Sequence, residues 1–141
     1  MLTVHLQAAG FLLLVLALGH GPIARRFLWR EEAQRLSAFN RQAFLVHAFF
    51  IALIVGFMGA LALFWPAALV TPSALGLPVT GGLTIFWAVR LYVQWFVYDS
   101  ALWRGKRFES LVHGLFTVFW LYLTVLFACC FRLQLGARLH L

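Results

Sequence analysis

Four long and nearly uncharged apolar stretches constrain the fold of this chain more than any other feature. They cover about residues 2–19, 42–65, 79–98 and 108–131. A helix needs about 20 mostly apolar residues to cross a bilayer, and backbone groups in lipid are satisfied only in helices or closed barrels. These stretches are too long and too continuous for barrel strands. The sequence therefore predicts an all-α integral membrane protein, with residues 1–141 forming a single domain of four transmembrane helices that run up, down, up and down.

The composition excludes an ordinary soluble domain and makes nucleic-acid binding a poor explanation of the charge. Hydrophobic residues make up 64% of the chain, charged residues only 11%, and the mean hydropathy is +0.93. A soluble domain is nearer half apolar and one quarter charged. The net charge of +7 comes from residues that lie between apolar stretches, which is how membrane proteins mark cytoplasmic loops. We therefore expect the lipid bilayer, and no nucleic acid, as a partner.

The distribution of basic residues predicts the orientation in the membrane. The first and last connections between apolar stretches carry Arg25, Arg26, Arg30, Arg35, Arg41, Arg104, Lys106 and Arg107, whereas the middle connection has no charge. By the positive-inside rule both basic connections lie in the cytoplasm and both termini lie outside. Arg132 and Arg138 oppose this orientation but are outnumbered. The arginine usage and the lack of targeting motifs favour a bacterial inner membrane.

The first connection and the second apolar stretch carry further structural signals. Residues 22–40 mix apolar and charged side chains, which fits either a short amphipathic helix in the headgroup plane or an ordinary basic loop. In the second stretch, small residues recur every four positions at Ala48, Ala52, Gly56 and Ala60. Small residues at this spacing let membrane helices approach closely, so we expect a packing seam there.

Arg90 interrupts the third apolar stretch and is the clearest functional signal. An ionisable group inside a membrane segment is expensive and usually marks a functional site. Gln94 and Tyr98 follow Arg90 at successive i+4 steps, so the three side chains share one face of a helix.

Two histidines lie at the same expected depth on other helices. His47 comes six residues after Arg41, and His113 comes six residues after Arg107. At 1.5 Å per residue both lie about 9 Å below the charged boundary. The second and fourth helices of such a bundle are diagonal neighbours, so their imidazoles could ligate one iron from two sides. We therefore expect a bis-histidine b-type haem that transfers electrons with quinone, with Gln94 or Tyr98 bonding a propionate or quinone oxygen and Arg90 compensating negative charge.

Three other functions remain open from the sequence. A non-haem iron or zinc site is one, with His20, His47, Glu109 and His113 as the candidate ligands. A pocket for a lipid-like acid or isoprenoid is another, with Arg90 pairing its anionic or carbonyl group and the histidines moving protons. The third is a protein without a cofactor that anchors or assembles other membrane subunits, with the histidines forming only packing hydrogen bonds.

The sequence does not say whether the protein is an enzyme. It contains no glycine-rich phosphate loop, no nucleophile elbow and no HExxH motif. Cys129 and Cys130 are neighbours without a further cysteine, which does not make a disulfide framework. His5 and His140 belong to the opposite membrane face, where we interpret them as interface residues that would form a second site only if the tail folds back.

Overall fold

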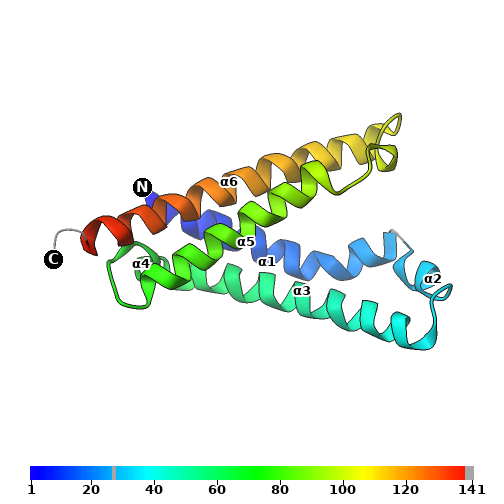
Figure 1. Cartoon of the computed structure of the whole chain (residues 1–141), viewed down its shortest axis with the longest axis horizontal. Helices are drawn as coiled ribbons and strands as arrows, with labels where there is room; N and C mark the ends of the chain where they lie inside the picture. The colour runs from blue at the N-terminus through cyan, green and yellow to red at the C-terminus, as the bar shows by residue number, and fades with distance from the viewer. Residues whose placement is uncertain (27, 139–141) are drawn as a thin grey trace. The chain divides into compact units, whose positions relative to one another are not determined.

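The computed structural model describes residues 1–26 and 28–138, and within those ranges all regular structure is helical. Figure 1 shows the elements in chain order. The long helices are α1 (Leu2–Arg26), α3 (Ala38–Phe64), α5 (Gly76–Phe96) and α6 (Arg107–Arg138). The short elements are α2 (Trp29–Ala33), α4 (Pro66–Val70) and the 3-10 turn η1 (Ser100–Leu102). Four described helices are long and apolar enough to cross a membrane, which confirms the all-helical, four-span part of the prediction.

The helices extend beyond the apolar stretches at several ends. Helix α1 continues to Arg26, where two arginines in the last turn suit the negative end of the helix dipole. Helix α3 begins at Ala38 because the Ser37 hydroxyl accepts a hydrogen bond from the Asn40 amide at 3.3 Å. Helix α6 continues through the polar residues after position 131. Hydropathy identifies only the apolar part of each helix. The backbone hydrogen bonds of the helix continue beyond the ends of that apolar part.

The chain divides into two compact units, which are described separately. Unit 1 contains Thr3–Pro66 and therefore α1, α2 and α3, while unit 2 begins at Ala67 and contains α4, α5, η1 and α6.

In unit 1, helices α1 and α3 are antiparallel and their backbones touch. A Cβ added to Gly10 would lie 2.5 Å from the Leu63 nitrogen and 2.7 Å from the Gly59 carbonyl oxygen. A Cβ on Gly59 would lie 2.9 Å from the Gly10 carbonyl oxygen. Further along, Ala17 faces Gly56. The predicted seam therefore contributes Gly56, but the closest approach is where Gly10 of α1 packs against Gly59 and Leu63 of α3.

In unit 2, helices α5 and α6 form an antiparallel hairpin. Three residue pairs define the register: the Gly81 backbone lies against the Phe131 ring, Trp87 stacks on Trp120, and Gln94 forms a hydrogen bond with His113. Across these pairs the residue number increases along α5 while it decreases along α6. The two helices are therefore antiparallel and stay in the same register from Gly81 to Gln94.

At the end of the hairpin opposite the α5–α6 connection, the buried Gln134 side chain of α6 bonds to the backbone that precedes α5. The Gln134 amide nitrogen donates to the carbonyl oxygens of Leu69 and Thr71 at 3.1 and 2.9 Å, and its oxygen accepts from the Ser73 amide at 2.9 Å. A Cβ on Gly76 would lie 2.5 Å from this amide group, so the glycine makes room for it. One side chain thus satisfies three backbone groups of the α4–α5 connection.

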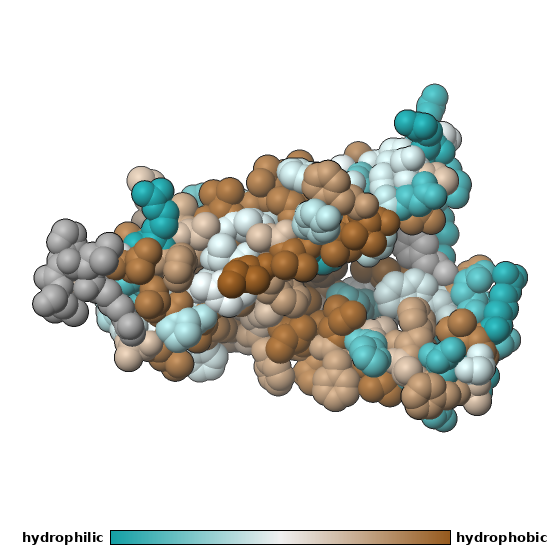
Figure 2. All heavy atoms as spheres, viewed as in Figure 1, coloured by the Kyte–Doolittle hydropathy of each residue, from teal (hydrophilic) through white to brown (hydrophobic). Residues whose placement is uncertain are grey.

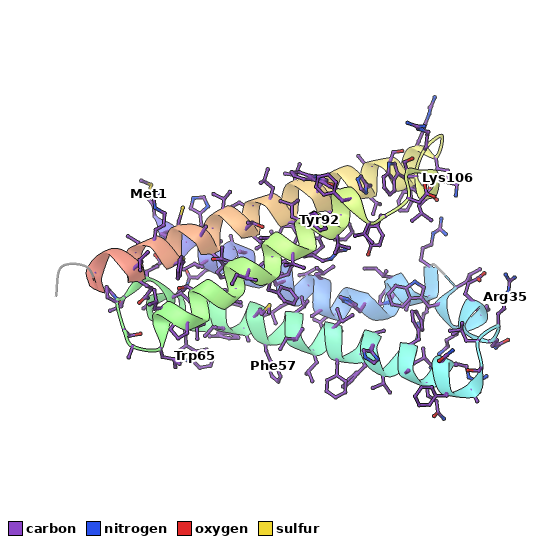
Figure 3. All side chains as sticks on the ribbon, in the orientation of Figure 1. Met1, Arg35, Phe57, Trp65, Tyr92 and Lys106 are labelled. Carbon is purple, nitrogen blue, oxygen red and sulfur yellow. The ribbon has the colours of Figure 1, made fainter. Side chains whose placement is uncertain are left out.

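Large apolar side chains cover the outer surfaces of the helices. Phe57 of α3 is 62% exposed and Val118 of α6 is 67% exposed. Figure 2 shows apolar colouring along the helices and hydrophilic colouring at the connections after α1 and after α5. In Figure 3, Phe57 projects away from α3, while Arg35 and Lys106 lie in the two basic connections. Apolar outer surfaces and closely packed small residues inside suit a lipid environment.

The connection between α1 and α3 contains a short helix of little more than one turn. Helix α2 has five residues and follows Leu28, whose φ of 52° is in the left-handed region. Ala33 is its buried residue, and Arg35 pairs with Glu32 at 3.6 Å. The connection therefore contains a helix, while its location in the headgroup plane stays a prediction, as do the up-and-down topology and the side on which the termini lie.

Candidate functional site

Arg90, Gln94 and His113 form a hydrogen-bonded chain inside unit 2, which we call the α5–α6 polar site. An Arg90 Nη1–H donates to Gln94 Oε1 at 3.2 Å. The Gln94 amide nitrogen lies 2.8 Å from His113 Nδ1 and 3.4 Å from the His113 carbonyl oxygen. Gln94 is only 4% exposed. The structure therefore brings together three of the predicted site residues and makes Gln94 the bridge between the other two.

The donors and acceptors of this chain fix the protonation pattern of His113. A guanidinium can only donate, so the atom of Gln94 that faces Arg90 must be the amide oxygen. The amide nitrogen then faces His113, and it too can only donate. His113 Nδ1 must accept with its lone pair, so in the neutral imidazole the hydrogen is on Nε2. His113 is thus a donor at Nε2.

Aromatic rings enclose both ends of the polar site. The Trp103 ring stacks on the His113 ring with a centroid distance of 3.8 Å and an interplanar angle of 13°. The guanidinium carbon of Arg90 lies 5.0 Å from the Trp120 ring centroid and 5.5 Å from that of Tyr98. Rings at these distances attract a cation through their negative faces, by about 0.5–2 kcal/mol each. Tyr98 therefore belongs to the site as a ring beside the cation.

The α5–α6 connection places Trp103 over the histidine. The Asp99 carboxylate accepts from the Ala101 amide at 2.9 Å and so starts η1. The Ser110 hydroxyl donates to the Trp103 carbonyl oxygen at 2.8 Å, which ties the loop to the first turn of α6. Gly105, with φ of 80°, allows the turn between them.

Two buried indole groups next to the site are without hydrogen-bond acceptors. Trp87 stacks on Trp120 at 5.1 Å and 15°, and the rings are 1% and 4% exposed. Within residues 1–26 and 28–138, neither Nε1–H has a partner. A buried unsatisfied donor costs about 1–3 kcal/mol, so each of these groups calls for an explanation.

The charge of Arg90 is also left without a carboxylate. In the described part of unit 2, no aspartate or glutamate lies within ion-pair distance of its guanidinium. Arg90 is half-buried in a helix that is apolar enough to span a membrane. A cation at such a position is normally paired or faces a cavity that serves a function.

The other two predicted histidine ligands share a cavity in unit 1. His20 Nδ1 lies 2.8 Å from the Leu16 carbonyl oxygen, and His47 Nδ1 lies 2.7 Å from that of Ala43. Both residues line a cavity of about 140 Å³, together with Trp29, Phe44, Ala48 and Ile51. The structure thus places His20 beside His47 in unit 1 and His113 beside Gln94 in unit 2.

Glu109 is the remaining candidate metal ligand. Glu109 lies in the first turn of α6, and within the described chain it makes no ion pair with His113. No cluster of three or more histidine, cysteine or acidic side chains suited to a metal ion occurs among the described residues. His140 lies outside the described residues. Because His47 belongs to unit 1 and His113 to unit 2, a haem held between them stays a prediction.

Sequence reasoning missed two aromatic residues of the polar site and the buried Gln134. Trp87 precedes Arg90 by three positions and Gln94 by seven, so helical spacing alone places it on their face. Trp103 reaches His113 from a loop, and no periodic pattern signals that contact.

Comparisons with known proteins add no assignment to this geometry. No family model, no curated protein and no solved structure matches the chain.

Proposed function

We propose that this protein is an integral protein of a bacterial inner membrane that binds the oxygen-bearing head of a lipid-like molecule at the α5–α6 polar site. One observation carries the proposal: the polar groups that the site leaves free are donors. The acceptors Gln94 Oε1 and His113 Nδ1 are used within the chain of hydrogen bonds. The other Arg90 N–H groups and His113 Nε2–H remain for a ligand.

Electrostatics favour the same kind of ligand. The Arg90 guanidinium has no carboxylate partner in the described part of unit 2, so an acceptor with negative charge or a strong dipole would offset the cost of the cation in lipid. A guanidinium also offers a planar fork of N–H groups, which suits carbonyl and carboxylate oxygens. The ligand head is therefore an oxygen acceptor.

Aromatic side chains adjoin both donors of the site, and we therefore place an isoprenoid quinone before a fatty acid. Trp103 stacks on the His113 ring, and Trp120 lies beside the Arg90 guanidinium. Trp120 also stacks on Trp87 and Phe116, so these rings would meet a quinone ring at their edges. In this role Arg90 holds one quinone oxygen and His113 donates its Nε2 hydrogen to the ligand.

Binding of two probes to the purified protein in detergent tests the proposal. A short-chain ubiquinone analogue represents the carbonyl head, and oleate represents the carboxylate head. Replacing Arg90 with methionine removes the charged donor and keeps an unbranched side chain. A hydrogen bond to a charged group contributes about 1.5–3 kcal/mol, so R90M is expected to weaken probe binding by about 10- to 150-fold.

The matched control is Arg132→Met, which removes an exposed arginine of the same helix hairpin at a distance from the site. It should bind both probes as the native protein does. Oleate bound more tightly than the quinone analogue would make the ligand a lipid-like acid with the same donors. If R90M binds both probes with native affinity, the proposal is wrong.

The same preparation also tests the haem predicted from the sequence. A Soret band that disappears in His47→Ala and in His113→Ala would establish the bis-histidine haem and replace the quinone-head proposal. Iron ligation by His113 Nε2 would need the opposite tautomer from the one that Gln94 imposes.

A further inference from the structure

Two histidines line a half-open cavity of unit 1, and the hydrogen bond of each is made through Nδ1. His20 comes from α1 and His47 from α3, and both line the same space of about 140 Å³. The rings of Trp29 and Phe44 meet edge to face at 5.7 Å along its wall. The cavity is lined by residues of unit 1, whereas the α5–α6 polar site belongs to unit 2.

The hydrogen bonds of the two histidines select the tautomer that binds metals. A backbone carbonyl oxygen can only accept, so Nδ1 of His20 and Nδ1 of His47 must carry hydrogens where they meet Leu16 and Ala43. Each Nε2 then has a lone pair. Metal-ligating histidines commonly donate their other N–H to a backbone carbonyl, which fixes the ring and raises its basicity.

The rest of the cavity limits which metal ion fits. Its other lining residues are Trp29, Phe44, Ala48 and Ile51, none of which is a carboxylate or thiolate. A zinc site normally has four ligands, or three and a water, and a doubly charged ion in apolar surroundings needs compensating charge. Imidazole nitrogens also suit copper, and the monovalent ion has the smaller charge to bury.

We propose that His20 and His47 bind one Cu(I) ion through their Nε2 atoms in unit 1. Two neutral nitrogen donors meet the low coordination number that Cu(I) accepts, and the exposed His47 leaves the half-open cavity accessible to the ion. This site goes beyond the proposed function and does not depend on Arg90, Gln94 or His113.

A copper titration of the full-length protein in detergent tests the proposal. Cu(I) is added without oxygen, under ascorbate, in competition with bicinchoninate. The native protein should retain one equivalent. His20→Leu and His47→Leu should each lower the Cu(I) affinity by at least about 100-fold, since loss of even an outer-shell partner of a metal ligand costs about 10- to 100-fold.

Two further variants separate metal binding from structural effects. His47→Met supplies a soft thioether, so it should restore most of the Cu(I) affinity that His47→Leu loses. His113→Gln changes only unit 2 and should retain copper. The proposal is overturned if the native protein holds no more Cu(I) than the leucine variants, if His47→Met fails to recover binding, or if His113→Gln abolishes it.

Discussion

Replacing Gly59 with leucine is expected to separate α1 from α3 and to lower the unfolding free energy of the protein by about 3 kcal/mol or more. The reason is that a Cβ at this position would lie within 3.0 Å of the Gly10 carbonyl oxygen, Leu13 Cβ and the Leu14 nitrogen. Two of these atoms are backbone, so no change of rotamer relieves the overlap. Unfolding by SDS, followed by circular dichroism at increasing mole fraction, measures the loss.

The matched control for this substitution is Gly82→Leu in α5, where an added Cβ meets nothing within 4 Å. An exposed substitution away from such contacts changes stability by about 0.5 kcal/mol at most. If Gly59→Leu and Gly82→Leu unfold at the same SDS mole fraction, the close contact between Gly10 and Gly59 is not present in the protein.

Replacing Gln134 with leucine is expected to release the α4–α5 connection from α6. The change strands the Ser73 amide and the Leu69 and Thr71 carbonyl oxygens, which the glutamine satisfies in the native protein. Leu69 is buried, whereas Thr71 and Ser73 are exposed, so water can replace the glutamine at those two groups. One stranded buried group costs about 1–3 kcal/mol, and the unfolding free energy should fall by that amount. Hydrogen exchange at the Ser73 amide should accelerate in the same variant.

A double-mutant cycle with Gly76→Ala shows whether the loss comes from this contact. A methyl group at Gly76 would overlap the Gln134 amide, so Gly76→Ala alone should destabilise the native protein. Residues in contact give non-additive effects of about 0.5–3 kcal/mol. Strictly additive losses in the double variant would mean that the two residues act independently, contrary to the structure.

Hydropathy was sufficient to predict the number and approximate positions of the membrane-spanning helices. The four apolar stretches identify the four spans because lipid selects for apolar length. Helices α1 and α6 extend beyond the apolar stretches because glycine, proline and charged residues lower the hydropathy without ending a helix. The contact of Gly10 with Gly59 was missed because it depends on where two helices cross, and only a four-residue repeat within one helix was visible.

The polar site was predictable only in part. Arg90 and Gln94 follow from i+4 spacing, and His113 follows from its depth, so the three residues could be named together before their contacts were known. The direction of each hydrogen bond could not be predicted, since it requires knowing which atom of Gln94 faces which neighbour. That direction places the hydrogen of neutral His113 on Nε2, while its role as a haem or metal ligand stays a prediction.

The most direct test of the account is ¹⁵N NMR of histidine-labelled protein in bilayers, which shows which ring nitrogen carries the hydrogen. We expect the hydrogen of neutral His113 on Nε2, and those of His20 and His47 on Nδ1, as their hydrogen-bond partners require. Gln94→Glu offers His113 only acceptors, so it should move a hydrogen to Nδ1 of His113 and leave the other two unchanged. Native His113 protonated at Nδ1, like His20 and His47, would contradict the donor site.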